Sequence, residues 1–239
     1  MLPNLIIAGF QKAGTTALGV NLSAHPQVAV ADSEAHFFSD RWDQGFSWYE
    51  SFLERKTETG GGNVPIYLGE KSPEYATRPD ALDRMRDALP DVKILLCVRN
   101  PITRAYSRYV DILEDEPSRL SGAGFDEIVA KAIRYDQHWV RNGLYSVHLQ
   151  NVLARFPREA IFVVVQERML SSPNDEMARL FKYLGLDPPP PRSHQHVHQG
   201  IYGSKMSARS RKKLREYFYR DVHMLREMLG DDLSEWGDF

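Results

Sequence analysis

The sequence lacks several features that mark disulfide-linked, membrane-spanning, secreted and nucleic-acid-binding proteins. Its single cysteine, Cys97, excludes an internal disulfide and fits a reducing compartment. No apolar run approaches the ~20 residues that a membrane-spanning helix needs, and the N-terminus lacks the charged and apolar regions of a signal peptide. The 30 basic and 32 acidic residues leave a net charge of −2. We therefore expect no nucleic-acid partner and no membrane partner.

The 239 residues, 42% of them hydrophobic, suffice for a single domain over residues 1–239. Patterns typical of strands and helices alternate, which favours an α/β fold with three layers and a central parallel sheet. We expect strands at 4–9, 27–30, 66–70, 93–99 and 161–165. We expect helices at 15–24, 79–89, 102–114, 125–136, 142–155, 174–185 and 207–229. Three segments are predicted loops, and the last is long enough to act as a flap: 56–64, 115–124 and 187–206.

The most specific local pattern lies directly after the first predicted strand. Gly9 and Gly14 bound a short loop that leads into a helix, so backbone N–H groups and the helix dipole can face an anion. The two glycines have the spacing of the nucleotide-triphosphate loop G-x-x-x-x-G-K-[ST], but Thr15 stands where the lysine should follow. The lysine lies inside the loop, as Lys12. The pattern predicts an anion site without the group that reaches the β- and γ-phosphates of a triphosphate.

A second candidate anion site follows the strand predicted at 93–99. Arg99 stands at the carboxyl end of this strand, and Pro101 opens the next helix, where its missing N–H is harmless. Ser107 lies about two turns into that helix. An arginine fork and a hydroxyl suit a phosphate monoester. Ligands of open α/β sheets bind at the carboxyl ends of strands, so both segments are candidate binding sites.

Together, these two segments resemble the sulfotransferases that use 3′-phosphoadenosine 5′-phosphosulfate (PAPS). The similarity is greatest to the heparan sulfate N- and 3-O-sulfotransferase branch and its bacterial relatives. Three further segments carry it: 33–38 (SEAHFF), 45–49 (GFSWY) and 70–75 (EKSPEY). The resemblance implies the P-loop-like sulfotransferase fold, with PAPS as co-substrate. It implies that the donor is bound by Gln11, Lys12, Ala13, Gly14, Thr15, Thr16, Arg99 and Ser107.

The resemblance also implies catalytic roles for four residues. Lys12 would stabilise the negative charge that builds on the bridging oxygen as it leaves. Glu34 would take the proton of the acceptor. His36 is either the rival base, an orienting residue or a merely packed histidine. Lys71 would lie near the acceptor and the phosphosulfate, and Glu70 is either its ion-pair partner or its partner in a purely structural pair.

Two other observations limit the resemblance. Lys205 lies where relatives have a nucleotide-binding Lys-Gly-Arg segment, but the Gly-Arg is missing, so it is a weaker candidate for the donor site. The sulfuryl group carries one negative charge, so the chemistry requires no Mg²⁺, and we expect no metal site. The alternating histidines His194, His196 and His198 lack a cysteine or acidic partner that would support one.

We therefore expect a PAPS-dependent sulfotransferase that acts on a hydroxyl, rather than an amine, of a small molecule. Sugars, lipids and natural products, free or carrier-bound, remain open as acceptors, and the oligomeric state is not predicted. A nucleoside-triphosphate-dependent kinase and a non-catalytic nucleotide-binding module remain the alternatives. Animal members of the branch carry a Golgi membrane anchor. Because we see no such segment, we expect a cytoplasmic enzyme.

Overall fold

The computed structural model describes residues 1–57, 65–115, 124–189 and 206–239. The chain forms two compact units, Met1–Val98 with Asn151–Val197 and Arg99–Gln150 with His198–Phe239. The five strands are β1 (Leu5–Gly9), β2 (Val28–Val30), β3 (Tyr67–Lys71), β4 (Lys93–Val98) and β5 (Ile161–Val165). The helices are α1 (Thr15–Leu22), α2 (Phe37–Asp40), η1 (Trp42–Gln44), α3 (Gly45–Thr57), η2 (Tyr75–Thr77), α4 (Pro79–Ala88), α5 (Pro101–Asp115), α6 (Phe125–Arg134), α7 (His138–Arg141), α8 (Tyr145–Leu153), η4 (Arg158–Ala160), α9 (Gln166–Ser171), α10 (Pro173–Leu184) and α11 (Ala208–Leu229).

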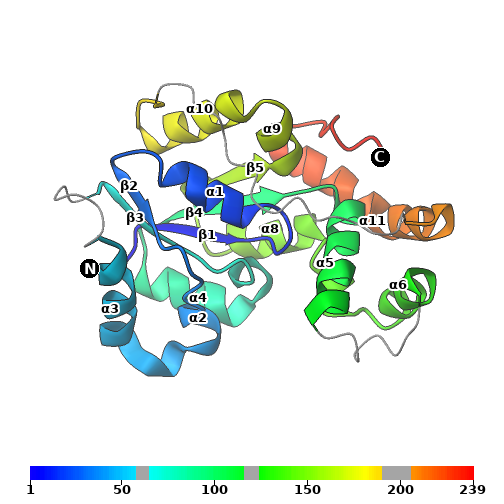
Figure 1. Ribbon diagram of the computed structural model, residues 1–239, viewed down its shortest axis with the longest axis horizontal. Coiled ribbons are helices and arrows are strands. Elements are labelled where there is room, and N and C mark those ends of the chain that lie inside the picture. The colour runs from blue at the N-terminus through cyan, green and yellow to red at the C-terminus, as the bar shows by residue number, and fades with distance from the viewer. Residues whose placement is uncertain (58–64, 116–123, 190–205) are drawn as a thin grey trace. The chain divides into compact units, whose positions relative to one another are not determined.

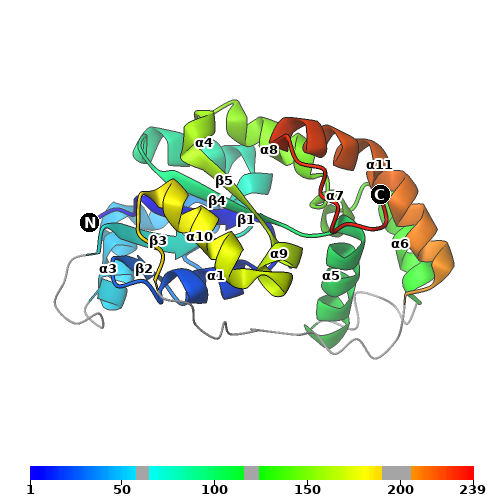
Figure 2. The same cartoon turned by 90° about the horizontal axis from the view of Figure 1, so that it is seen from above.

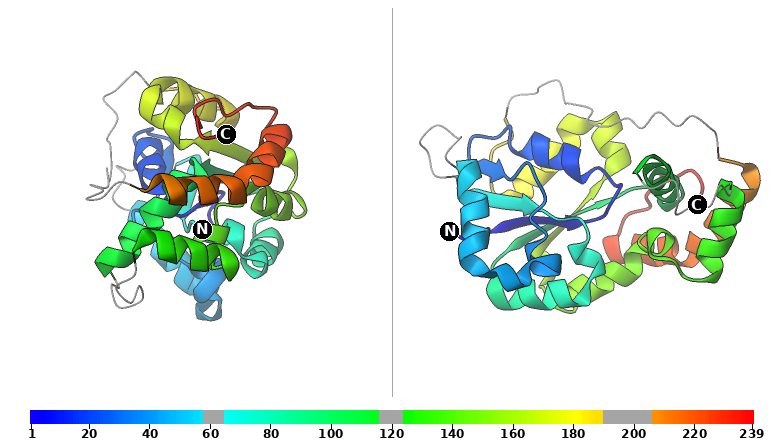
Figure 3. Two further views of the ribbon diagram at one scale, coloured as in Figure 1. Left: turned by 90° about the vertical axis from the view of Figure 1, so that its right-hand side faces the viewer. Right: turned by 60° about the horizontal axis from the view of Figure 1, so that its bottom comes forward.

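The first unit is built on a parallel sheet with the strand order β2-β3-β1-β4-β5 (Figure 1). Helices α1 and α10 lie over one face of this sheet, and α2 and α4 lie over the other (Figure 3, right). Every residue of β1 is buried, as expected for a central strand that is covered on both faces. The predicted three-layer α/β/α fold is confirmed.

The second unit consists of helices. Helix α11 contacts α5 and α6, and α7 contacts the same two helices (Figure 2). Tyr106, Tyr109 and Ile128 form a buried cluster, against which Phe125 and Trp139 pack. Ser207 caps the N-terminus of α11, because its side chain accepts a hydrogen bond from the N–H of Ser210.

Most predicted elements agree with the structure to within a few residues, and the differences are local. Strand β3 ends on Lys71, one residue later than expected. Helix α3 was not predicted, because its aromatic residues do not follow the helical period clearly, and the short α2, α7 and α9 were not predicted either. Most of the three expected loops lies outside the described residues. In the parts of the chain that the structure covers, no helix combines the length and apolar character needed to cross a membrane.

Candidate active site

The loop between β1 and α1 contains two residues with a left-handed backbone conformation and leads directly into a helix. Gly14 precedes α1 with φ 93°, in the left-handed region that favours glycine. Lys12 also has a positive φ, 65°, which is costly for a residue with a Cβ and is a feature often found at functional sites. Thr15 and Thr16 form the first turn of α1, where backbone N–H groups have no partner within the helix. Gln11 and Ala13, which we expect to bind the donor, lie in the same loop.

Lys71 connects this loop to a second segment of the chain. It is the last residue of β3, and only 8% of its side chain is exposed. Its Nζ donates to Oγ1 of Thr16 at 3.1 Å and lies 3.4 Å from Oε1 of Glu34. A buried ammonium group requires an anionic or polar partner, and these two contacts supply both. The structure thus brings three predicted site residues together.

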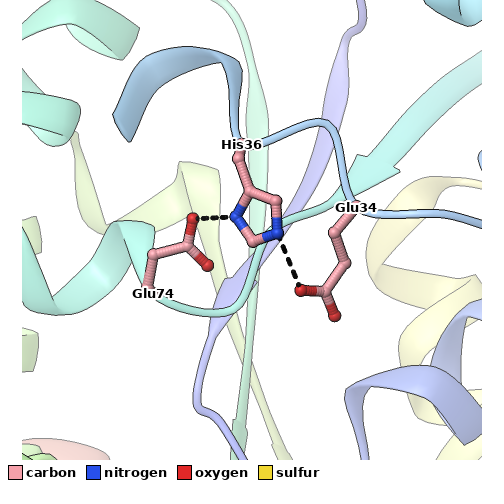
Figure 4. A group of neighbouring side chains, drawn as sticks. All are labelled: Glu34, His36 and Glu74. Carbon is pink, nitrogen blue, oxygen red and sulfur yellow. Dashed lines mark hydrogen bonds and ion pairs between the residues drawn. The ribbon is translucent and has the colours of Figure 1, made fainter. Parts of the chain in front are cut away.

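His36 lies between two carboxylates (Figure 4). Its Nε2 is 3.3 Å from Oε2 of Glu34, and its Nδ1 is 2.6 Å from Oε1 of Glu74. Ser39 donates a second hydrogen bond to the same oxygen of Glu74, at 2.7 Å. About a third of each of the Glu34 and His36 side chains is exposed (32%), against 12% for Glu74. Glu34 is therefore accessible while it contacts both the imidazole and the Lys71 ammonium group.

Glu74 is the residue that sequence reasoning missed. It lies within the segment 70–75 that indicated the family, but nothing in that segment assigned it a role. His36 and Glu74 are 38 positions apart. They meet because a turn follows β3, in which the N–H of Tyr75 donates to the carbonyl oxygen of Ser72. The signal available in the sequence was that Glu74 lies in the segment 70–75. Its pairing with His36 depends on the three-dimensional fold.

A fully buried carboxylate supports the segment that carries His36. The carboxylate of Glu70 accepts hydrogen bonds from the hydroxyls of Tyr49, at 3.1 Å, and Ser72, at 2.8 Å. The same Ser72 oxygen accepts from the backbone N–H of His36 at 2.9 Å. Burial raises the pKa of Glu70 to about 7, although the hydrogen bonds from Ser72, Tyr75 and Tyr49 lower it.

The expected ion pair between Glu70 and Lys71 is wrong. Successive strand residues point to opposite faces of a sheet, and the ammonium group of Lys71 pairs with Glu34 instead. The carboxylate of Glu70 is held by hydroxyl groups. The two neighbours therefore belong to two different clusters.

The aromatic residues near His36 pack mainly against one another. The rings of Phe37 and Tyr49 stack with centroids 4.2 Å apart, and Phe38 meets Tyr49 edge-on at 5.5 Å. These three residues are fully buried, whereas Phe46 is 41% exposed. This arrangement indicates that these aromatic residues pack the core of the unit rather than bind an acceptor.

Glu34, His36 and Glu74 also meet the distance condition for metal ligands, because one ligand atom of each lies within 4.8 Å of the others. Figure 4 shows, however, that the carboxylates face opposite nitrogens of the imidazole ring. A metal ion binds one ring nitrogen, so it would replace one of these contacts and leave the other. The arrangement favours a hydrogen-bonded chain over a metal centre.

The second unit contains the other predicted donor-binding residues. The Nε of Arg99 donates to Oγ1 of Thr103 at 2.9 Å. Ser107, 9% exposed, lies four residues beyond Thr103 in α5, which places both on one face of the helix. The hydroxyl of Tyr145 donates to the carbonyl oxygen of Arg99 at 2.9 Å and fixes its backbone. The guanidinium of Arg99 therefore contacts Thr103, which shares a helix face with Ser107.

Lys205, the weaker donor-site candidate, lies outside the described residues. The same holds for the alternating histidines His194, His196 and His198, and for most of the segment that we interpreted as a flap.

Comparison with known proteins gives consistent results. Residues 2–228 match the family model described as Sulfotransferase domain. Heparan sulfate glucosamine 3-O-sulfotransferase 6 of Mus musculus is 37% identical over 191 residues, which cover 77% of this chain and 52% of that protein. Heparan sulfate glucosamine 3-O-sulfotransferase 5 of Homo sapiens is 33% identical over 202 residues, covering 82% and 56%. The chain spans about half the length of the curated relatives it matches.

Solved structures show the same likeness. The crystal structure of a sulfotransferase from Alicyclobacillus acidocaldarius matches with a TM-score of 0.80 and 29% identity, covering 99% of each chain. The sulfotransferase domain from the curacin biosynthetic pathway matches with a TM-score of 0.53 over 79% of this chain and 76% of that one. At 18% identity, the second likeness shows the fold alone.

Proposed function

Because the chain belongs to the sulfotransferase domain family, we propose that it transfers a sulfuryl group from PAPS to a hydroxyl group of an acceptor. The observation that supports this most strongly is the position of Lys71, whose ammonium group contacts both Thr16 at the start of α1 and the carboxylate of Glu34. An anion-binding loop and a candidate base are thereby joined through one buried cation.

We assign the sulfuryl end of the donor to the loop between β1 and α1. The N–H groups of this loop and of Thr15 and Thr16 would hold the phosphosulfate. Lys12 would stabilise the charge on the bridging oxygen as the bond to sulfur breaks, more strongly in the transition state than in the ground state. Arg99 and Ser107 would bind the 3′-phosphate, which suits an arginine fork beside a hydroxyl. Lys205 is the remaining candidate for the donor site.

The proposed reaction is a direct displacement. A lone pair of the acceptor oxygen forms the new O–S bond, while the bond between sulfur and the bridging oxygen breaks and leaves its electron pair on 3′-phosphoadenosine 5′-phosphate. Glu34 takes the acceptor proton, since its carboxylate is partly exposed and lies beside Lys71. No covalent intermediate on the protein is needed, and the site as described calls for no metal ion.

We propose a sugar hydroxyl as the acceptor, because relatives of this chain are named for transfer to a glucosamine of heparan sulfate. Lipids and other natural products, whether free or carrier-bound, have no specific observation in their favour. The cytoplasmic location expected from the sequence is part of this proposal.

Two experiments test the proposed function. The protein is incubated with PAPS and a panel of mono- and oligosaccharides, and products are detected by the mass gain of one SO₃ group. The Lys12→Ala variant is the control for background transfer. We expect a sulfated product with the wild-type protein and almost none with the variant.

A calorimetric titration separates the alternatives. We expect 3′-phosphoadenosine 5′-phosphate to bind much more tightly than ATP–Mg²⁺. Tighter binding of ATP–Mg²⁺, with phosphate transfer to an acceptor, would support the kinase. Binding of 3′-phosphoadenosine 5′-phosphate without transfer to any acceptor in the panel would support a non-catalytic binding module.

A further inference from the structure

We propose that Glu74 is a positioning residue, which holds a proton on Nδ1 of His36 so that Nε2 can receive the proton that Glu34 removes from the acceptor. This inference rests on the proposed function, because it extends the role of Glu34 given there. It assigns a role to a carboxylate that the sequence did not single out.

The contacts of Glu74 fix its relation to His36. Its Oε1 lies 2.6 Å from Nδ1 of His36 and also accepts from the hydroxyl of Ser39 at 2.7 Å. Its Oε2 is buried and has no hydrogen-bond partner in the described parts of the chain. The hydrogen bonds found for this carboxylate therefore converge on the oxygen that faces the imidazole. The Nδ1 contact, at 2.6 Å, is much shorter than the 3.3 Å between Nε2 and Glu34, so we assign the single proton of the neutral ring to Nδ1.

The burial of Oε2 of Glu74 should lower the stability of the folded protein. A carboxylate oxygen that is removed from water without a compensating hydrogen bond has a cost in free energy. Ser39 and His36 offset part of it, and a neutral side chain at position 74 would avoid it. A charged side chain at position 74 is explained if its carboxylate stabilises a positive charge that forms on the imidazole of His36.

The other nitrogen of His36 faces the proposed base. Nε2 lies 3.3 Å from Oε2 of Glu34, while Oε1 of Glu34 lies 3.4 Å from the Lys71 ammonium group. With Nδ1 protonated, the neutral ring presents a lone pair at Nε2. A proton that Glu34 takes from the acceptor oxygen can then pass to this lone pair, which restores the carboxylate of Glu34.

The proton balance of this sequence is closed. One proton leaves the acceptor oxygen as the O–S bond forms, resides on Glu34, and moves to Nε2, where it converts the imidazole into an imidazolium ion. The negative charge of Glu74 stabilises this ion through Nδ1–H. The proton is released to water after the products leave, since about a third of the His36 side chain is exposed.

The backbone around His36 also favours a fixed orientation. Its φ of 51° lies in the left-handed region, and its N–H donates to Oγ of Ser72 at 2.9 Å. Ser72 in turn donates to the fully buried Glu70. The imidazole is thereby held from the backbone side as well as by Glu74, so rotation of the ring away from Glu34 is restricted.

The first test is independent of any activity. The nitrogen chemical shifts of the His36 ring are measured in the wild-type protein and assigned by comparison with a His36→Gln variant. They are measured at a pH high enough that the ring carries a single proton. We expect that proton on Nδ1. In Glu74→Ala we expect it to move to Nε2, because the carboxylate of Glu34 is then the remaining acceptor beside the ring. A wild-type ring protonated at Nε2 would overturn the inference.

The second test measures turnover. We expect Glu74→Gln to lower kcat by about 10- to 100-fold, as for groups that orient a functional histidine, and to leave KM for PAPS and the affinity for 3′-phosphoadenosine 5′-phosphate unchanged. Glu74→Asp should recover part of the loss, because it restores the charge. The remote Asp83→Asn is the matched control and should have little effect.

A kcat of Glu74→Gln equal to that of the wild-type protein would overturn the inference, as would an equal loss in Asp83→Asn. Failure of the proposed function would look different. In that case neither the wild-type protein nor any variant would transfer a sulfuryl group from PAPS, while the chemical shifts of His36 would still report where Glu74 places the proton.

Discussion

Two glutamates of the first unit, Glu34 and Glu70, differ in exposure and in the groups that they contact. About a third of the Glu34 side chain is exposed, and it contacts the Lys71 ammonium group and the imidazole of His36. Glu70 is fully buried and is held by the hydroxyls of Tyr49 and Ser72. Both clusters meet at β3, whose last two residues are Glu70 and Lys71.

The difference teaches which properties to look for in a candidate site. A group that exchanges a proton with a ligand needs access and neighbours that carry charge. A buried carboxylate with neutral donors is suited to hold a segment in place, and here the segment is the one that carries His36. Substitutions on the exposed side should therefore change turnover, and those on the buried side should change stability.

The largest effect on the exposed side is expected from Lys12→Ala. Loss of a fixed charge at the leaving oxygen should lower kcat by about 10³-fold, which corresponds to about 4 kcal/mol of transition-state stabilisation. Single-turnover transfer from PAPS measures this rate. The matched control is Lys182→Ala, which removes an exposed lysine of α10. A comparable loss in both variants would contradict the role of Lys12.

Glu34→Gln should lower kcat by about 10²- to 10³-fold, because the amide cannot accept the acceptor proton. The melting temperature should change little, because the amide oxygen of Gln and the hydroxyl of Thr16 can still accept from the Lys71 ammonium group. The same single-turnover assay checks the rate. If Glu34→Gln leaves kcat intact while His36→Ala abolishes it, His36 is the base, and the roles must be exchanged.

On the buried side, Glu70→Gln should change the pH dependence of stability. The pKa of Glu70 is raised from 4.5 to about 7 in the folded protein, so the folded state binds the proton more tightly than the unfolded state. The free energy of unfolding should then fall as the pH rises from about 4.5 to about 7, by about 3 kcal/mol in total, and level off above that range.

The free energy of unfolding is measured by urea denaturation of the wild-type protein and Glu70→Gln between pH 4.5 and pH 8. This range is set by the pKa of Glu70. The variant should lack the decrease that Glu70 causes. Asp83→Asn is the control and should keep the wild-type slope, because its ion pair with Arg155 holds the pKa of the Asp83 carboxyl below this range. Parallel curves for the wild-type protein and Glu70→Gln would show that Glu70 does not titrate in this range.

The smallest effect is expected from Gly14→Ala. Its φ of 93° is unfavourable for alanine, and the added Cβ would lie 3.2 Å from Cγ of Gln166. We expect a loss of about 1–2 kcal/mol in the free energy of unfolding, together with weaker binding of 3′-phosphoadenosine 5′-phosphate, measured by calorimetry. Gly124→Ala is the matched control, because no atom of the described residues lies within 4 Å of the Cβ that it would add. Equal binding by Gly14→Ala and the wild-type protein would argue against this loop as the donor site.

The predicted features differ in how far they depend on local sequence. The loop from Gly9 to Gly14 was identified because its spacing and the following helix start are encoded in adjacent residues. The five strands were found for the same reason, since apolar runs mark buried strands. The family expected from these residues agrees with the match over 2–228.

What could not be predicted depends on contacts across the fold. Glu74 meets His36 only after β3 and the following turn are in place. The expected pairing of Glu70 with Lys71 failed because neighbours in a strand point to opposite faces. Sequence proximity is thus a poor guide to partners within a strand, and a segment that marks a family does not by itself assign roles to all its residues.

The central claim is that the loop between β1 and α1 binds the sulfuryl end of PAPS beside the Lys71–Glu34 pair. The most direct test is a crystal structure with 3′-phosphoadenosine 5′-phosphate. We predict its 5′-phosphate on the N–H groups of the loop and of Thr15 and Thr16, within hydrogen-bond distance of Lys12. Electron density for the nucleotide elsewhere, with this loop closed by side chains, would contradict the account.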